Sequence, residues 1–212
     1  MTLDQLLTEL VSLPPSRRDA EVERLLGVAT PGGDDAPPGA ELIGYHASGL
    51  APVLRALREA PVTSADVFID LGSGLGKVAL LARLISGARV LGIETQRALL
   101  DRAPRLEGVE FVHADVRGAP LDEGTVFFLY NPFSGGALRE VLERLHAVAQ
   151  HHAIVVCALG IDVEHGTESW LRPRPTDAFW LQLFDSVVPG VPPRVVEPPR
   201  FDARLHRLAG EW

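Results

Sequence analysis

The chain has 212 residues, of which 46% are hydrophobic and 23% are charged, and its formal net charge is -8. This is the composition of a globular protein with a sizeable core, and the acidic balance argues against a broad phosphate-binding surface. No apolar span is long enough to cross a bilayer and no signal-peptide pattern occurs, so we expect a cytoplasmic protein without membrane attachment. The single cysteine, Cys157, excludes internal disulfides and a thiolate metal cluster, and we expect no metal site.

Two short helices are predicted at the N-terminus. Leucines at helical spacing predict an amphipathic helix over residues 3–11. Ser16 followed by Asp19 resembles a capping box and predicts the start of a second helix. Proline, glycine and aspartate in residues 30–39 predict a linker. We therefore divide the chain into a helical N-terminal extension with its linker, residues 1–40, and one main domain, residues 41–212.

A glycine-rich turn between a strand and a helix is the most informative stretch of the chain. Residues 67–71 are apolar and rich in strand formers, and they lead directly into Gly72, Gly74 and Gly76. Apolar residues then recur at helical spacing until Gly87 ends the helix. Such a turn at the carboxyl end of a central strand shapes the usual ligand crevice of an open α/β sheet.

The spacing of these glycines separates three classes of cofactor. A P-loop would have four residues between Gly72 and Gly76, but only three lie there, and Val78 replaces the hydroxyl that binds magnesium. A dinucleotide fingerprint would read G-x-G-x-x-G, whereas this chain reads G-x-G-x-G after an acid, Asp70. The stretch Asp70-Leu71-Gly72-Ser73-Gly74-Leu75-Gly76 closely resembles motif I of class I (seven-strand) S-adenosylmethionine-dependent methyltransferases. The resemblance implies that Asp70, Gly72, Ser73, Gly74 and Gly76 bind the cofactor, with Asp70 offsetting its positive amino end.

Two acids downstream extend the resemblance. Residues 89–94 predict a second buried strand that ends in Glu94, whose carboxylate suits both hydroxyls of an adenosine ribose. A helix is predicted over residues 96–103. Residues 109–113 predict a third strand, which Asp115 follows closely. In the family, an acid at this place accepts from the adenine amine, but an aspartate in an exposed turn fits the sequence as well.

Two further residues near the turn have open roles. Tyr45 lies just before a predicted helix over residues 50–60, and in the family this region packs ahead of motif I and covers the cofactor. An ordinary loop aromatic is an equally good interpretation. Lys77 is the only lysine in a chain whose other basic residues are arginines. That usage is typical of a GC-rich genome and does not by itself indicate a function for Lys77.

The fourth predicted strand, residues 125–130, ends at the triplet Asn131-Pro132-Phe133. The triplet resembles the [N/D]-P-P-[Y/F] motif of methyltransferases that act on planar amino groups, but it has one proline fewer. It is closer to the motif of seven-strand protein-lysine methyltransferases and of many uncharacterised bacterial relatives. The resemblance implies catalytic roles: Asn131 and the following carbonyl accept from the target N–H, and Phe133 stacks on it. Asn131 as a plain turn residue is the alternative.

The end of the chain predicts a different arrangement of strands. A helix that follows Gly135-Gly136, with apolar residues from 138 to 148, and a fifth strand over residues 153–159 complete the alternating β/α units. Residues 179–184 and 201–208 are then predicted to pair as an antiparallel hairpin. The expected fold is α/β: a Rossmann-like, doubly wound, mostly parallel seven-stranded sheet with a C-terminal antiparallel hairpin and a small helical N-terminal extension.

The sequence therefore predicts an S-adenosylmethionine-dependent methyltransferase. We expect the acceptor to be a nitrogen of a protein side chain or a small molecule, and we regard nucleic acid as an unfavoured partner. The arginines between residues 172 and 207 leave open a local basic patch. Two alternatives also stay open, an NAD(P)-dependent Rossmann oxidoreductase and a cofactor-binding module without turnover. The oxidoreductase is disfavoured because no length remains for a second set of βαβ units.

Overall fold

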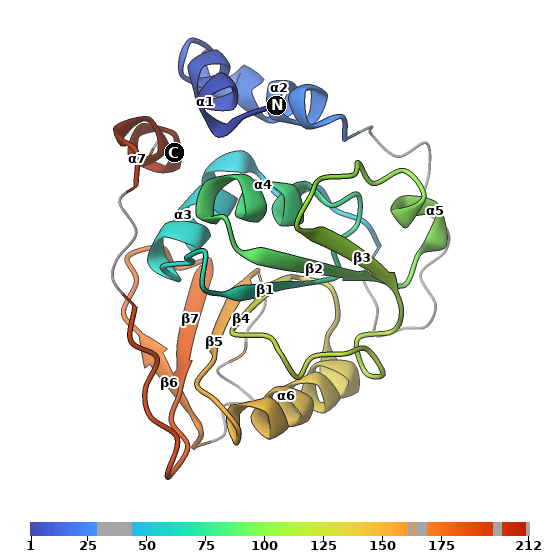
Figure 1. The fold of residues 1–212 in the computed structure, drawn as a ribbon, viewed down its shortest axis with the longest axis vertical. Coiled ribbons are helices and arrows are strands. Elements are labelled where there is room, and N and C mark those ends of the chain that lie inside the picture. The colour runs from blue at the N-terminus through green and yellow to red at the C-terminus, as the bar shows by residue number, and fades with distance from the viewer. Residues whose placement is uncertain (29–43, 161–162, 164–168, 197–200, 211–212) are drawn as a thin grey trace.

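A computed structural model describes residues 1–28, 44–160, 163, 169–196 and 201–210 (Figure 1). The helices are α1 (Leu3–Val11), α2 (Pro15–Leu26), α3 (Leu50–Glu59), α4 (Lys77–Ser86), α5 (Arg97–Leu100), α6 (Gly135–Ala149) and α7 (Ala203–Gly210). The strands are β1 (Val67–Leu71), β2 (Arg89–Glu94), β3 (Val109–His113), β4 (Val126–Tyr130), β5 (Val155–Leu159), β6 (Leu171–Arg174) and β7 (Leu181–Ser186). The predicted linker over residues 30–39, and with it the domain boundary at residue 40, lies outside the described residues.

The strands form one seven-stranded sheet in the order β3-β2-β1-β4-β5-β7-β6. The strands from β3 to β5 are parallel, whereas β7 inserts antiparallel between β5 and β6. Strand order reverses between β1 and β4, which is where an open α/β sheet forms its ligand crevice. The prediction of a mostly parallel sheet with an antiparallel hairpin is confirmed.

Helices cover both faces of the sheet, because side chains along each central strand alternate between two cores (Figure 1). On one face Phe68 and Phe128 pack with the apolar sides of α3 and α4. The helices α1, α2 and α7 add a further layer to the same core. On the other face Ile69 and Leu129 pack against α6. Burial on both faces explains why β1 and β4 read as continuous apolar runs.

Two helix boundaries differ from the prediction. The helix α2 begins at Pro15 without a side-chain cap, so the capping box of Ser16 and Asp19 is wrong. Proline is favoured in the first turn because it has no N–H to satisfy. Asp19 instead contacts the start of α3. The predicted helix over residues 96–103 shortens to α5, a single turn.

The C-terminal hairpin is built from different segments than the sequence predicted. The partner of β7 is β6, and residues 203–210 form the helix α7 instead of a strand. In α7 the buried residues Leu205, Leu208 and Ala209 are spaced by three and four, which places them on one helical face against α3. The edge strand β6 contains Pro173. An edge strand tolerates a proline, but a proline within a run of residues argues against a strand, so the sequence did not predict β6.

Within the described residues, no helix is long and apolar enough to span a membrane. The same residues contain no group of three or more His, Cys, Asp or Glu side chains arranged to hold a metal ion. Cys157 is buried in β5, where burial raises the pKa of its thiol.

Candidate active site

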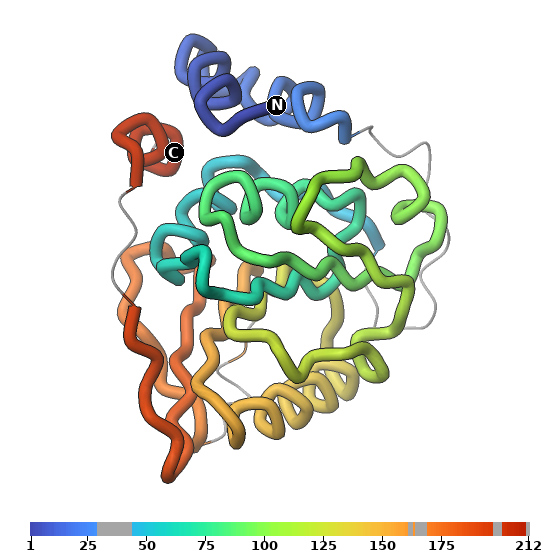
Figure 2. The backbone as a smooth tube through the Cα atoms, viewed as in Figure 1, coloured from blue at the N-terminus to red at the C-terminus, as the bar shows by residue number. Residues whose placement is uncertain are grey.

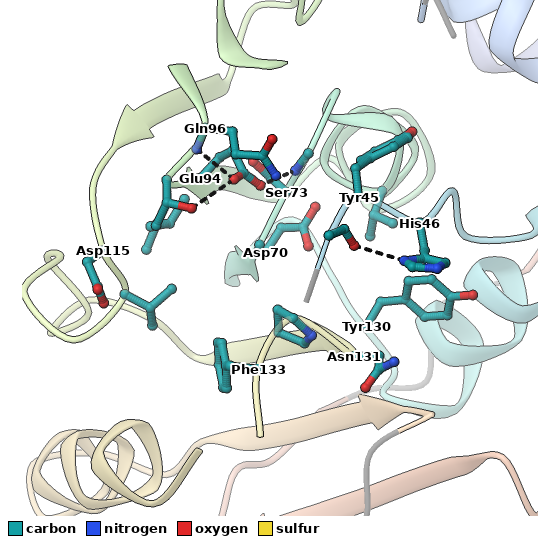
Figure 3. A pocket seen from close by; sticks show the side chains of 18 of the residues that line it. Tyr45, His46, Asp70, Ser73, Glu94, Gln96, Asp115, Tyr130, Asn131 and Phe133 are labelled. Atoms are coloured by element: carbon teal, nitrogen blue, oxygen red, sulfur yellow. Dashed lines mark hydrogen bonds between the residues drawn. The ribbon is translucent and has the colours of Figure 1, made fainter. Parts of the chain in front are cut away.

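A pocket opens at the carboxyl ends of β1, β2 and β4, with an empty volume of about 970 Å³ that includes its open mouth. Figure 3 shows Asp70 near its middle, with the group Glu94, Ser73 and Gln96 on one side and Phe133 on the other. Every residue singled out from the sequence lines the pocket except Gly76.

The glycine turn is packed too closely for any side chain. The backbone N–H groups of Gly72 and Ser73 both donate to the carbonyl of Ile93 at 2.9 Å, which holds the turn over β2. A Cβ on Gly72 would lie 2.6 Å from Pro132, and a Cβ on Gly74 would lie 2.5 Å from the ring of Tyr45. Both glycines also have positive φ, a backbone conformation that residues with a Cβ rarely adopt. The turn thus packs directly against both Tyr45 and Pro132, which were predicted separately.

Gly76 has a structural role in this arrangement. It caps the N-terminus of α4 in the left-handed region, at φ 83°. A Cβ there would meet the ring of Phe111 on β3 at 2.4 Å. The predicted contact of Gly76 with a cofactor therefore has no support in the pocket, and the glycine instead allows α4 to pack against the sheet.

Glu94 is held rigidly at the end of β2. One carboxylate oxygen accepts from the N–H of Gly74 at 2.9 Å, and the other accepts from the N–H of Gln96 at 2.9 Å and the hydroxyl of Thr95 at 3.2 Å. A carboxylate offers about four acceptor positions, and these three bonds leave one of them, on the oxygen that accepts from Gly74, for the pocket. Glu94 therefore fixes the glycine turn and still presents an acceptor for a hydroxyl group.

Three buried oxygen atoms of the pocket lining have no hydrogen-bond partner among the described residues: Oδ2 of Asp70, Oγ of Ser73 and Oε1 of Gln96. Buried polar atoms are normally paired, so these three indicate a polar ligand that supplies donors. Burial, with the neighbouring charge of Glu94, raises the pKa of Asp70 to about 8. A cationic ligand would favour the ionised form.

Asp115 lies at the rim of the pocket and is already engaged. Its carboxylate accepts from the backbone N–H of Arg117 at 2.8 Å and from that guanidinium at 2.7 Å. These bonds hold the pKa of Asp115 below its usual range. The neighbouring Val116 is buried and lines the same part of the pocket with an apolar surface. Asp115 is thus a charged rim residue beside an apolar wall.

The triplet after β4 forms the opposite wall (Figure 3). Asn131 has φ 45°, the one positive value for a non-glycine residue in the part of the chain that the structure describes. Its N–H donates to the carbonyl of Leu159 at 3.1 Å, which anchors the strained residue to β5. Asparagine tolerates this region, and such strain often marks a functional site. Phe133 is 4% exposed and packs mainly in the core under the pocket.

Sequence reasoning missed several lining residues. The most informative are Ser48 and Gln96, which are both buried at the pocket wall. Gln96 follows Glu94 by two residues, so its position just after β2 could have predicted that it lines the pocket. Nothing in the local pattern marks Ser48, because the segment before α3 reaches the site only through the tertiary fold.

An aromatic edge, formed by Phe179 and Trp180, lies beyond Asn131 and outside the pocket lining. The N–H of Gly160 donates to the carbonyl of Trp180 at 3.2 Å, and a Cβ on Gly160 would lie 3.8 Å from that of Asn131. The start of β7 and the end of β4 therefore lie on either side of the end of β5. Phe179, next to Trp180, is 98% exposed. The side chain of Phe179 is outside the pocket lining, so it is available only to a ligand that extends beyond the pocket.

Comparisons with solved structures support the fold. An RNA methyltransferase from Salinibacter ruber, solved with S-adenosylhomocysteine, matches 72% of this chain and 99% of its own at 24% identity and a TM-score of 0.54. A candidate RNA methyltransferase from Pyrococcus horikoshii matches 81% of this chain and 99% of its own at 18% identity and a TM-score of 0.53. A candidate methyltransferase from Streptococcus mutans, also solved with S-adenosylhomocysteine, has a TM-score of 0.51 at 7% identity, covering 68% of this chain and 100% of its own.

Sequence comparison gives a shorter match. No protein-family model matches the chain. A trans-aconitate 2-methyltransferase from Paracidovorax citrulli is 43% identical over 67 residues, which span 31% of this chain and 26% of that relative. The structural matches cover 68% to 81% of the chain at TM-scores of 0.51 to 0.54. The chain therefore has the Rossmann-like fold of class I methyltransferases.

Proposed function

We propose that this protein is an S-adenosylmethionine-dependent methyltransferase that transfers the methyl group to a nitrogen of a protein side chain or a small molecule. The observation that carries the proposal is the set of three unpartnered buried oxygens around a pocket at the switch point of this fold. The matched methyltransferases, two of them solved with S-adenosylhomocysteine, support the same enzyme class.

The residues present fit such a cofactor. In the proposal, the ribose hydroxyls donate to Glu94, and the adenine ring lies against Val116 at the Asp115 rim. Asp70, Ser73 and the glycine turn hold the amino-acid end, with Tyr45 against the turn. The bound cofactor supplies an electrophilic methyl group on a sulfonium. The protein holds the acceptor on the axis of the breaking S–C bond and excludes water, and such orientation supplies about 7–11 kcal/mol of a barrier.

The acceptor side suits an amine. In the proposal Asn131 and the Pro132 carbonyl accept from the acceptor N–H and so direct its lone pair at the methyl group. The new N–C bond forms as the S–C bond breaks, and a proton leaves the nitrogen. A lysine must be neutral to react, and in the proposal its desolvation beside Tyr130, which lines the pocket, favours the neutral amine. The resemblance of Asn131-Pro132-Phe133 to protein-lysine methyltransferases points in the same direction.

The charges around the site disfavour a nucleic-acid acceptor. The pocket lining contains three acids, Asp70, Glu94 and Asp115, and its two strong bases, Lys77 and Arg117, are both ion-paired. Several C-terminal arginines are also paired with carboxylates: Arg174 with Asp185, Arg194 with Asp66, and Arg204 with Asp4 and Asp202. Phosphate binding needs accessible cations. Two of the structural matches are described as RNA methyltransferases, but at 24% and 18% identity they inform the fold alone.

Two experiments test the proposal. A thermal-shift panel should show stabilisation by S-adenosylmethionine and S-adenosylhomocysteine but not by NAD or NADP, by about 2.7 kcal/mol at 100 times the dissociation constant. A response to NAD alone would identify an oxidoreductase. Transfer of a radiolabelled methyl group into cell lysate then identifies the acceptor. Label that nuclease removes and protease spares would overturn the nitrogen acceptor proposed here, and binding without any transfer would indicate a module without turnover.

A further inference from the structure

The helix α2 of the N-terminal extension contacts two other helices through carboxylates on one of its faces. Asp19 and Glu23 are four residues apart and therefore adjacent on the helix surface. Oδ1 of Asp19 accepts from the backbone N–H of Leu50 at 2.6 Å. Oε1 of Glu23 accepts from Nζ of Lys77 at 2.7 Å. Figure 2 shows the N-terminal helices lying across the layer that contains α3 and α4.

The two contacts reach two adjoining walls of the pocket. Leu50 is the first residue of α3, and the segment just before it contributes Tyr45 and Ser48 to the lining. Lys77 is the first residue of α4, directly after the glycine turn, and it lines the pocket itself. These walls meet where the Tyr45 ring packs on Gly74. The helix α2 thus joins the start of one wall to the start of the other.

Lys77 is an unfavourable residue in its position without Glu23. It is 4% exposed, so its charge is removed from water. It also lies at the N-terminus of α4, where the helix dipole already places positive charge. The carboxylate of Glu23 compensates for both effects. Without it, a buried cation would face the pocket in which the proposed cofactor carries its own positive charge.

Asp19 performs the equivalent task at α3. The N-cap residue of α3 is Gly49, which has no side chain to accept from the first N–H groups of the helix. Asp19 supplies that acceptor from another helix, and its negative charge also suits a helix N-terminus. The start of α3, and with it the segment that contains Tyr45, is therefore held in place by α2.

We propose that Asp19 and Glu23 are positioning residues of the cofactor site, which makes the N-terminal extension part of the binding machinery. Glu23 neutralises Lys77 and so adapts the pocket to a cationic ligand, and Asp19 fixes the Tyr45 segment against the glycine turn. The inference rests on the proposed function, because the ligand charge comes from the sulfonium of S-adenosylmethionine. S-adenosylhomocysteine has the same shape without that charge.

The test measures the affinities of both compounds for the full chain by calorimetry. Glu23→Gln should weaken the binding of S-adenosylmethionine on the order of tenfold more than the binding of S-adenosylhomocysteine. This is the size of one charge–charge interaction at an intermediate dielectric. Asp19→Ala removes a cap and should weaken both compounds on the order of fivefold. Glu21→Gln is the matched control: Glu21 is on the same helix, equally exposed at 22%, and pairs with Arg24 instead. It should change neither affinity.

Removing the lysine separates charge from structure. The double variant Glu23→Gln/Lys77→Met should restore the wild-type ratio of the two affinities. If Glu23→Gln alone does not fold, the double variant is compared with the single variant Lys77→Met. An unchanged ratio in folded Glu23→Gln, or an equal loss for both compounds that Lys77→Met does not reverse, overturns the role of Glu23. Unchanged affinities in Asp19→Ala overturn the role of Asp19. Failure of the wild-type protein to bind either compound would instead overturn the proposed function.

Discussion

The two halves of the pocket are built in opposite ways. At the ends of β1 and β2, internal hydrogen bonds fix the glycine turn and Glu94 before any ligand arrives, and the unpartnered oxygens are buried. At the end of β4, the pocket lining contains a strained Asn131, whereas the exposed Phe179 lies outside that lining, just before β7. The first half is preorganised for one small molecule. We therefore expect variants in the two halves to separate cofactor binding from transfer.

The largest expected effect lies in the acceptor half. Asn131→Ala should reduce turnover by about 100- to 1,000-fold, because it removes a group that positions the nucleophile, while cofactor affinity stays within a few-fold. Alanine is also strained at φ 45°, so Asn131→Gly is the matched control, because glycine adopts this backbone conformation readily and lacks the side-chain amide. Both variants should be inactive in the radiolabel assay. Recovery of activity in Asn131→Gly would reduce Asn131 to a turn residue.

The next effect lies in the cofactor half. Glu94→Ala should weaken S-adenosylhomocysteine by about 10- to 150-fold, since a hydrogen bond to a charged group contributes about 1.5–3 kcal/mol. Glu94→Gln keeps one acceptor for the Gly74 N–H, so we expect it to lose less affinity for S-adenosylhomocysteine than Glu94→Ala. Calorimetry on variants with native circular dichroism measures both. An affinity equal to wild type in folded Glu94→Ala would show that this carboxylate has no part in binding.

A third prediction concerns pH. Because Asp70 has a pKa of about 8 without ligand, it is protonated at neutral pH, and a cationic ligand should expel that proton. Affinity for S-adenosylmethionine should therefore rise with pH toward about 8, by up to about tenfold per unit, and level off above it. Calorimetry in buffers of different ionisation enthalpy should detect one released proton. Asp70→Asn should bind weakly and without this slope, and a flat profile in the wild type would contradict the prediction.

The same shift predicts how stability varies with pH. A carboxyl group whose pKa is raised by folding binds more protons in the native state than in the unfolded state, so stability falls as pH rises from about 4 to about 8. Thermal denaturation of the ligand-free protein across this range should show the decline. Asp70→Asn should remove the share of the decline that this residue causes.

The smallest effect concerns the aromatic edge. Phe179→Ser should leave cofactor affinity unchanged and stability within about 0.5 kcal/mol, because the side chain is almost fully exposed. For a protein acceptor, we expect KM to rise a few-fold, as an exposed aromatic is a typical contact for a partner. Val195→Ser is the control: Val195 is 92% exposed and follows Arg194, which pairs with Asp66 just before β1. Equal effects of both variants would exclude a specific role for Phe179.

Local patterns in the sequence determined much of this molecule. The strands β1 to β5, the glycine turn and the residues Asp70, Glu94 and Asn131 at strand ends were predictable, because buried parallel strands are apolar runs and the turns after them share one edge. The resemblance to motif I added the cofactor. These features depend on neighbours in the chain, so the chain alone carries them.

Tertiary contacts decided the rest. The edge strand β6, interrupted by Pro173, and the helix α7 take their form from what they pack against, so no local pattern predicted them. The ion pair of Lys77 with Glu23 joins residues 54 positions apart. Spacing along the chain does not encode such pairs, because the fold brings the two elements together. The sequence by itself determined which residues meet at the ends of the central strands, and only the tertiary structure decided that the N-terminal helices hold them there.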